Sequence, residues 1–141
     1  MSRKIFTLFI MTLFFIKANT QIISPSLQIT IDNASSSDMI AITIQMSEQY
    51  DVASLSQILE SMTREEKRQL VISELKSFAY FSQQSIMNSI NYLKATGDVE
   101  HVREFWMVNM ISCTAKPGAI YQFAQRQDVY IIHIDEDYDY G

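Results

Sequence analysis

The chain has 141 residues, of which 48% are hydrophobic, so it has room for one ordinary domain with a core. Its 3 glycines and 2 prolines exclude fibrous and low-complexity classes, and its net charge of −5 argues against a nucleic-acid partner, because such a chain repels phosphate. The single cysteine, Cys113, excludes an intramolecular disulfide and argues against a zinc site, so a buried, inert thiol is expected.

The N-terminal residues 1–20 have the pattern of a secretory signal peptide. Arg3 and Lys4 precede an apolar run over residues 5–16, which is shorter than the ~20 residues that span a bilayer. Cleavage before Gln21 would remove three basic residues and take the net charge from −5 to −8. The mature chain is therefore expected to be secreted or periplasmic, without stable membrane association. An uncleaved membrane anchor is the alternative.

Residues 21–37 are expected to form a linker, because small and polar residues dominate both of its ends. Within it, Leu27, Ile29 and Ile31 alternate with polar residues, which predicts a short strand. Asn33 begins an Asn-Ala-Ser tripeptide that matches the acceptor pattern for N-glycosylation.

The first firm strand is expected at residues 39–46, where Ile40, Ile42 and Ile44 alternate with smaller or more polar residues. A short helix is expected within residues 52–62.

A long helix is expected to follow, from Thr63 to Ala95. Thr63 and Glu66 form a capping box at its start, and Gly97 suits its C-terminal end. A single helix of this length would be roughly 48 Å long at 1.5 Å per residue. Because that exceeds the size of such a domain, we expect either a break or a projecting first turn.

The last third of the chain predicts two strands, a short helix and a final strand. The strands are expected at Val99–Met107 and Asn109–Thr114, with a tight connection between them. Pro117 suits the first turn of the short helix, and Val129–Ile134 is the last strand.

The resulting order is strand, long helix, strand, strand, short helix, strand, which is the ferredoxin-like split βαβ arrangement. We therefore expect an α+β domain over residues 38–135, with a four-stranded antiparallel sheet and two helices on one face. An acidic tail, residues 136–141, follows it. This architecture hosts many functions and so predicts none by itself.

Motifs that would indicate catalysis are missing from the sequence. It contains no G-x-S-x-G, P-loop, G-x-G-x-x-G or H-E-x-x-H motif, and structural roles are expected for His101 and His133. The acidic run 135–139 lacks the glycine and the distal glutamate of a calcium loop. We therefore expect no enzymatic activity, no metal and no cofactor.

The segment Arg103–Ile111, with the sequence REFWMVNMI, resembles part of the propeptides of subtilisin-like serine proteases, the inhibitor I9-type domain. There an aromatic residue precedes a hydrophobic-Val-Asn step. Further similarities follow in the family's order along residues 38–135: the strand 39–46 with residues 48–51, Leu75-Lys76, Ala79, Ser82-Gln83, Ile120–Ala124, Arg126, Asp128-Val129, Ile132 and Asp135. The family's fold is the same ferredoxin-like arrangement.

The resemblance implies a module that binds and inhibits a subtilisin-like protease and assists its folding as an intramolecular chaperone. In that family the sheet packs on two helices of the protease, and the C-terminal tail runs through the active-site cleft like a substrate. The expected cleft-binding residues are Asp135, Asp137, Tyr138, Asp139, Tyr140 and Gly141. The expected contacts from the sheet face and the strand connection are Glu104, Trp106 and Asn109, with Glu104 capping the N-terminus of a protease helix.

The catalytic part of such a protease is missing from this sequence, which has no D-[ST]-G, H-G-T or G-T-S motif. The chain is therefore interpreted either as a stand-alone inhibitor or chaperone, or as a fragment separated from its protease part. The alternative hypothesis is a secreted ferredoxin-like ligand-binding or interaction domain unrelated to proteases. A tail packed back on its own domain, beside a ligand-filled apolar pocket, would favour that alternative.

Overall fold

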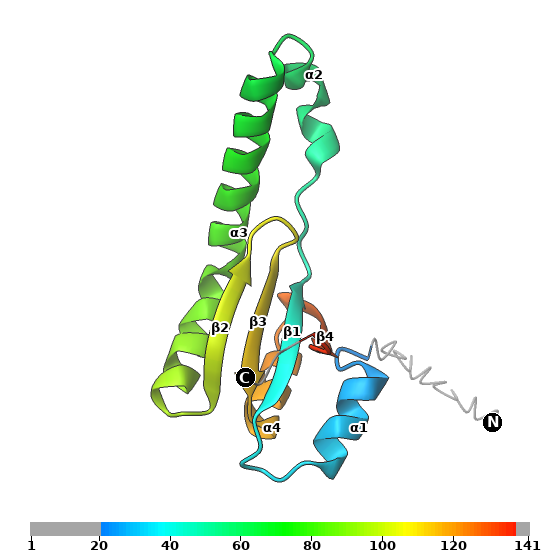
Figure 1. Cartoon of the computed structure of the whole chain (residues 1–141), viewed down its shortest axis with the longest axis vertical. Coiled ribbons are helices and arrows are strands. Elements are labelled where there is room, and N and C mark those ends of the chain that lie inside the picture. The colour runs from blue at the N-terminus through cyan, green and yellow to red at the C-terminus, as the bar shows by residue number, and fades with distance from the viewer. Residues whose placement is uncertain (1–20, 138–141) are drawn as a thin grey trace, which may run out of the picture.

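The computed structural model describes residues 21–137, which form an α+β domain with a four-stranded antiparallel sheet (Figure 1). The elements in chain order are α1 (Pro25–Asn33), β1 (Ile40–Met46), the 3-10 helix η1 (Val52–Leu55), α2 (Ser56–Leu59), α3 (Arg64–Ala95), β2 (Val99–Phe105), β3 (Met110–Ala115), α4 (Pro117–Ala124) and β4 (Val129–Ile134). The proposed signal peptide, residues 1–20, lies outside the described residues.

The sheet has the order β2-β3-β1-β4, so that the first strand of the chain lies inside it. β1 pairs antiparallel with both β3 and β4, and β2 pairs antiparallel with β3. A short parallel bridge joins Ile23 to Ile132, where the amide of Ser24 donates to the carbonyl of Ile132 at 2.9 Å. The segment before α1 therefore adds to the β4 edge, and β2 forms the other edge of the described sheet.

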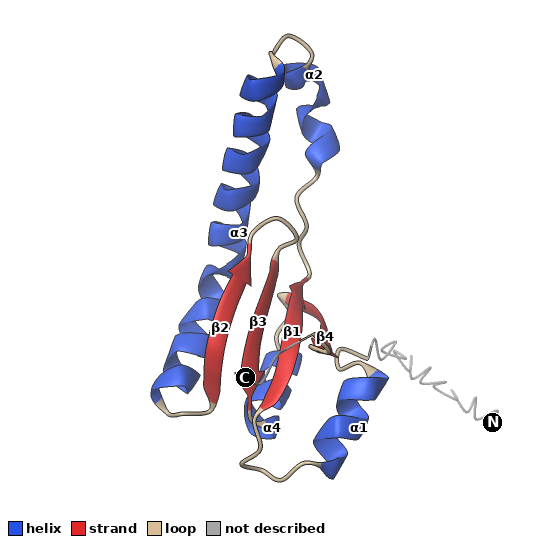
Figure 2. Ribbon diagram, viewed as in Figure 1, coloured by secondary structure: helices blue, strands red, loops and turns tan. Residues whose placement is uncertain are grey.

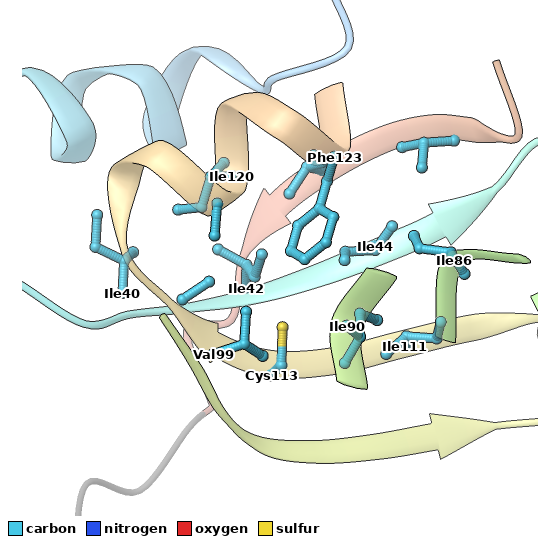
Figure 3. Close-up of a cluster of buried hydrophobic side chains, with 14 of the residues drawn as sticks. Ile40, Ile42, Ile44, Ile86, Ile90, Val99, Ile111, Cys113, Ile120 and Phe123 are labelled. Carbon is cyan, nitrogen blue, oxygen red and sulfur yellow. The ribbon is translucent and has the colours of Figure 1, made fainter. Parts of the chain in front are cut away.

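The core lies between one face of the sheet and the helices. Ile42 and Ile44 of β1 stand opposite Cys113 and Ile111 of β3, and all four side chains are buried (Figure 3). The helices α3 and α4 cover them with Ile86, Ile90, Ile120 and Phe123. This alternation confirms the expected strand at residues 39–46, which begins at Ile40.

A third helix, α1, occupies the segment where a linker with a short strand was expected, so the strand prediction was wrong. Ser24 caps the helix by accepting a hydrogen bond from the amide of Leu27, and Pro25 occupies its first turn. Leu27 and Ile31 lie one turn apart and are buried in the core, whereas Ile29 is 63% exposed. Apolar residues at positions 27, 29 and 31 fit the two-residue period of a strand, and positions 27 and 31 also fit one face of a helix. The segment is helical in the structure, where Leu27 and Ile31 share the face that is buried in the core.

The long helix α3 runs for 32 residues without the break that we considered (Figure 2). Its N-terminal half instead projects beyond the sheet, alongside η1 and α2, which is much more than the first turn that we expected to project. We call residues 52–75 the arm. The capping box is present as predicted: the carboxylate of Glu66 accepts from the Thr63 amide at 2.8 Å, and the Thr63 hydroxyl accepts from the Glu66 amide.

The base of the arm is held to the domain by Tyr50, which precedes η1. Its ring meets that of Phe78 edge to face, with centroids 5.4 Å apart, and its hydroxyl donates to Glu74 at 3.2 Å. These contacts tie the chain between β1 and η1 to the middle of α3. Within the described residues, no helix is long and apolar enough to cross a membrane.

The end of α3 is joined to the start of α4 through Asp98, and this junction makes stability depend on pH. Hydrogen bonds from Thr96 at 2.6 Å and from Lys116 at 3.0 Å hold the pKa of the Asp98 carboxyl below its usual 3.8. A carboxyl whose pKa is lowered on folding adds stability above its unfolded pKa, and this stability is lost as the pH falls through the folded pKa.

We therefore expect the melting temperature to fall as the pH is lowered from neutrality through the region around 3.8, and to fall less steeply in Asp98→Asn. Thermal unfolding followed by circular dichroism across that range tests the difference. Asp137→Asn, a change at an exposed carboxyl, is the control and should keep the slope of the unmodified chain. Equal slopes for all three chains would contradict the role of Asp98.

Candidate functional site

The sheet has a second face, which none of the described helices covers. We call this the open face (Figure 2). Because successive side chains point to opposite sides of a strand, its members are the residues that alternate with the core positions. Taken from β2 to β4, they are Glu100, Arg103, Phe105, Met110, Ser112, Thr114, Ala41, Thr43, Gln45, Ile131 and His133. The open face has small residues at its centre, and its edge strands carry Glu100, Arg103 and Phe105 on one side and Ile131 and His133 on the other.

The β2 edge of the open face is irregular. The pairing of β2 with β3 shifts register between Glu100 and Arg103, and His101 between them has a positive φ of 52°. The imidazole Nδ1 of His101 lies 3.2 Å from the hydroxyl of Thr114. This bulge bends the edge strand and brings the His101 side chain over the neighbouring strand.

Asp135, the residue directly before the acidic tail, lies on this same face. The amide of Asp135 donates to the carbonyl of Ala41 at 2.9 Å, and its carboxylate accepts from the hydroxyl of Ser112 at 3.1 Å. Ser112 is two strands away from β4, so the Asp135 side chain points across the sheet and not away from it. Glu136 and Asp137 follow and are exposed. The other expected cleft-binding residues, Tyr138, Asp139, Tyr140 and Gly141, lie outside the described residues.

Glu104 and Trp106 lie together, but on the helix side of β2 and not on the open face. Glu104 stands opposite the core residue Ile111, and with Trp106 it lines a pocket of about 430 Å³ against α3. The ammonium of Lys76 lies 5.3 Å from the centre of the Trp106 ring, a cation–π arrangement. Glu104 is exposed at the edge of this pocket and remains accessible to a partner.

Asn109 is buried, so its side chain is not accessible in this structure for the expected contact with a partner. Its side chain is 3% exposed and donates to the carbonyl of Glu48 at 2.7 Å and to the hydroxyl of Ser82 at 2.8 Å. It accepts a hydrogen bond from the amide of Gln83 at 2.9 Å. Asn109 also has a positive φ of 45°, a conformation that asparagine tolerates better than most residues. Its role in this structure is to hold the β2–β3 turn against α3.

Strand β2 ends earlier than predicted, at Phe105 instead of Met107, because residues 106–109 form the β2–β3 turn. Its tip presents apolar side chains to solvent: Met107 is 65% exposed and Val108 is 48% exposed. Phe105 extends this apolar tip onto the open face. In the sequence, the residues of this apolar tip belong to a continuous run of strand formers. The turn over residues 106–109 exposes their side chains.

The described residues contain no group of three or more histidine, cysteine or carboxylate residues that could hold a metal ion. His133 lies on the open face and His101 at its edge bulge, on different strands.

Cys113 lies in the middle of the core, and its thiol is expected to be unreactive in the folded chain. Burial raises the pKa of this thiol to about 12, so the nucleophilic thiolate is negligible at neutral pH. We expect a thiol reagent to label Cys113 rapidly only after unfolding in denaturant. Mass spectrometry of native and unfolded samples, labelled for equal times, measures this. Rapid labelling of the native chain would contradict the buried position.

Comparison of this chain with models of protein families, with curated proteins and with solved structures finds no match.

Proposed function

We propose that this chain is a subtilase-propeptide-like module that binds and inhibits a subtilisin-like serine protease and assists the folding of that protease. In this proposal, residues 1–20 direct secretion, and the domain belongs to the ferredoxin-like split βαβ arrangement. The strand order β2-β3-β1-β4, with the long helix between β1 and β2 and the short helix between β3 and β4, supports that assignment.

The observation that carries the proposal is the open face of the sheet. The family that the sequence resembles packs this kind of sheet surface against two helices of its protease. Here α1, α3 and α4 all contribute to the core on the other side, so a partner can lie flat against the open face. Its centre holds the small, buried residues Ala41, Ser112 and Thr114. A partner would contact the accessible side chains around them, which are Thr43, Gln45, Arg103, Phe105 and His133.

The β2–β3 turn supplies the second element of the proposed contact. Phe105, Met107 and Val108 present an apolar surface next to the open face, and exposed apolar clusters of this kind mark interaction sites. Glu104, exposed beside them, offers a carboxylate for the N-terminus of a partner helix, where the helix dipole is positive. The tail that continues from β4 would then enter the cleft as an extended strand.

The contact between Asp135 and Ser112 is the observation that favours the alternative, a secreted ligand-binding or interaction domain unrelated to proteases. It shows the residue directly before the tail packed on its own sheet. The pocket of about 430 Å³ between α3 and Trp106 is a place for a small ligand in that alternative.

Inhibition assays separate the two hypotheses. A purified subtilisin-like protease is titrated with residues 21–141, with the same chain lacking residues 135–141, and with Tyr92→Ser. Tyr92 is exposed on α3, which packs on the other side of the sheet, so its substitution is the control. We expect the first chain and the control to inhibit at micromolar concentration, and the truncated chain to lose most of this inhibition because nothing fills the cleft. Failure of every form to slow the protease would exclude the proposed function.

A further inference from the structure

The pocket between α3 and Trp106 has an apolar wall with two aromatic rings. Its volume of about 430 Å³ lies in the range of small-ligand sites in proteins. Ala79 and Met87 of α3 and Trp106 of the β2–β3 turn form the wall, and Tyr80, which is 67% exposed, lies beside them. A ligand can therefore place an apolar surface against these rings.

Hydrogen bonds between the helix and the turn hold the pocket together. The side chain of Gln83 lines the pocket, is 3% exposed and donates to the side chain of Asn109 at 2.9 Å. Asn109 also donates to the hydroxyl of Ser82 at 2.8 Å, so the turn is bound to α3 at two adjacent residues. The pocket is therefore formed before any ligand enters it.

The remaining polar side chains of the pocket are available to a ligand. Gln84, Asn88 and Glu104 are exposed, and no described residue forms a hydrogen bond or an ion pair with their side chains. Each amide can both donate and accept, the carboxylate of Glu104 accepts, and the ammonium of Lys76 donates. Several hydroxyl groups on one ligand would suit this mixture, because a hydroxyl also donates and accepts.

The charges that line the pocket do not favour an ionic ligand. They are one cation, Lys76, and one anion, Glu104. These two charges cancel, so the field of the pocket selects neither a cation nor an anion over a neutral ligand. A purely apolar ligand is disfavoured as well, because it would cover polar groups without replacing their hydrogen bonds to water.

An aromatic wall beside polar side chains matches the two surfaces of a sugar. The face of a sugar ring carries C–H groups with small positive charges, which pack against the negative face of an aromatic ring. Its hydroxyl groups project from the edge of the ring, where they can reach the amides of Gln84 and Asn88. Both parts of the pocket are then used by one ligand.

We propose that the pocket between α3 and the β2–β3 turn binds a neutral sugar. The sugar ring packs against Tyr80 and Trp106, and its hydroxyl groups bind Gln84, Asn88 and Glu104. This inference goes beyond the proposed function and does not depend on it, since the pocket lies on the helix side of β2 and not on the open face.

Trp106 provides the readout, because it is the only tryptophan of the chain and lines the pocket itself. Its fluorescence is followed while residues 21–141 are titrated separately with maltose, cellobiose and lactose, three neutral disaccharides. We expect a saturable change with at least one of them at millimolar concentration. Choline and acetate, a small cation and a small anion, should give no saturable change.

Two matched pairs of variants locate the binding, and all four variants keep Trp106. Asn88→Ala should weaken it about fivefold through lost hydrogen bonds, whereas Asn91→Ala, at an exposed position outside the pocket, should not. Tyr80→Ala should weaken binding to a similar extent. Tyr92→Ala removes a ring that is 70% exposed on the same helix but outside the pocket, and should have no effect.

Three results would overturn the proposal. The first is the absence of a saturable change with all three disaccharides. The second is saturation with choline or acetate but with no sugar, which would assign the pocket to an ion. The third is equal weakening by the two members of each pair, which would place the sugar elsewhere. No protease is present in these titrations, so their failure leaves the proposed function standing, and failed inhibition leaves the sugar site standing.

Discussion

Replacement of Asn109 by alanine is expected to lower the free energy of unfolding by about 3 kcal/mol, one of the two largest effects that we predict for a single side chain. The amide of Asn109 serves three partners on two other elements: the carbonyl of Glu48 after β1, and Ser82 and Gln83 in α3. Alanine would leave these polar groups without their partner, at a cost of roughly 1–3 kcal/mol for a buried group.

Backbone conformation adds to this cost. Asn109 has a φ of 45°, and alanine in the left-handed region is disfavoured by roughly 1–2 kcal/mol. Glycine bears no such penalty, although it loses the same hydrogen bonds. Asn109→Gly should therefore be more stable than Asn109→Ala by about 1 kcal/mol, and less stable than the unmodified chain.

Urea unfolding of the three chains, followed by the fluorescence of Trp106, measures these differences. Gln83→Ala and Gln84→Ala form a matched pair, because Gln83 is buried and bound to Asn109 while Gln84 is exposed. We expect a clear loss of stability for the first and almost none for the second. Equal stability of Asn109→Ala and the unmodified chain would refute the role of the network.

The turn at Asn109 illustrates which features of this protein the sequence predicts. The resemblance to propeptides pointed to Asn109 as part of a hydrophobic-Val-Asn step, but it assigned the residue to a contact with a partner. In the structure, Asn109 binds Glu48, which lies 61 residues away in the sequence. No local pattern reveals a hydrogen bond of this kind, since it depends on how β1, α3 and the turn meet.

The strands and the long helix were predictable because their signals are local and repeated. Ile40, Ile42 and Ile44 alternate over the whole of β1, and the Thr63 capping box marks the first turn of α3. The residues of the open face could also be predicted from the sequence in principle, because each of them alternates with a core residue. What the sequence does not show is that α1 joins the other helices on the core side, so that no described helix covers the open face.

The projecting arm shows that the size of the domain does not by itself predict where a long helix ends. A helix of roughly 48 Å exceeds a domain of this length, and this made a break a reasonable expectation. The chain avoids the break by pairing the first half of α3 with η1 and α2, and Tyr50 secures the base of this pair.

The second large effect concerns α1, the helix that lies where a linker was expected. Replacement of Leu27 by alanine is expected to lower the free energy of unfolding by about 3 kcal/mol, because a fully buried leucine loses its contacts and leaves a cavity. In a linker outside the domain, the same change would cost almost nothing. The free energy of unfolding of Leu27→Ala therefore decides whether the folded unit begins before residue 38.

Ile29→Ala is the matched control, since Ile29 lies on the same helix, two residues away, and is 63% exposed. Its replacement should change the free energy of unfolding by no more than about 0.5 kcal/mol. Chemical denaturation of both variants gives the comparison. Equal effects at the two positions would mean that α1 does not pack on the core. A loss confined to Leu27 would place the start of the domain at the bridge between Ile23 and Ile132, so that a chain cut at residue 38 would lack part of its own core.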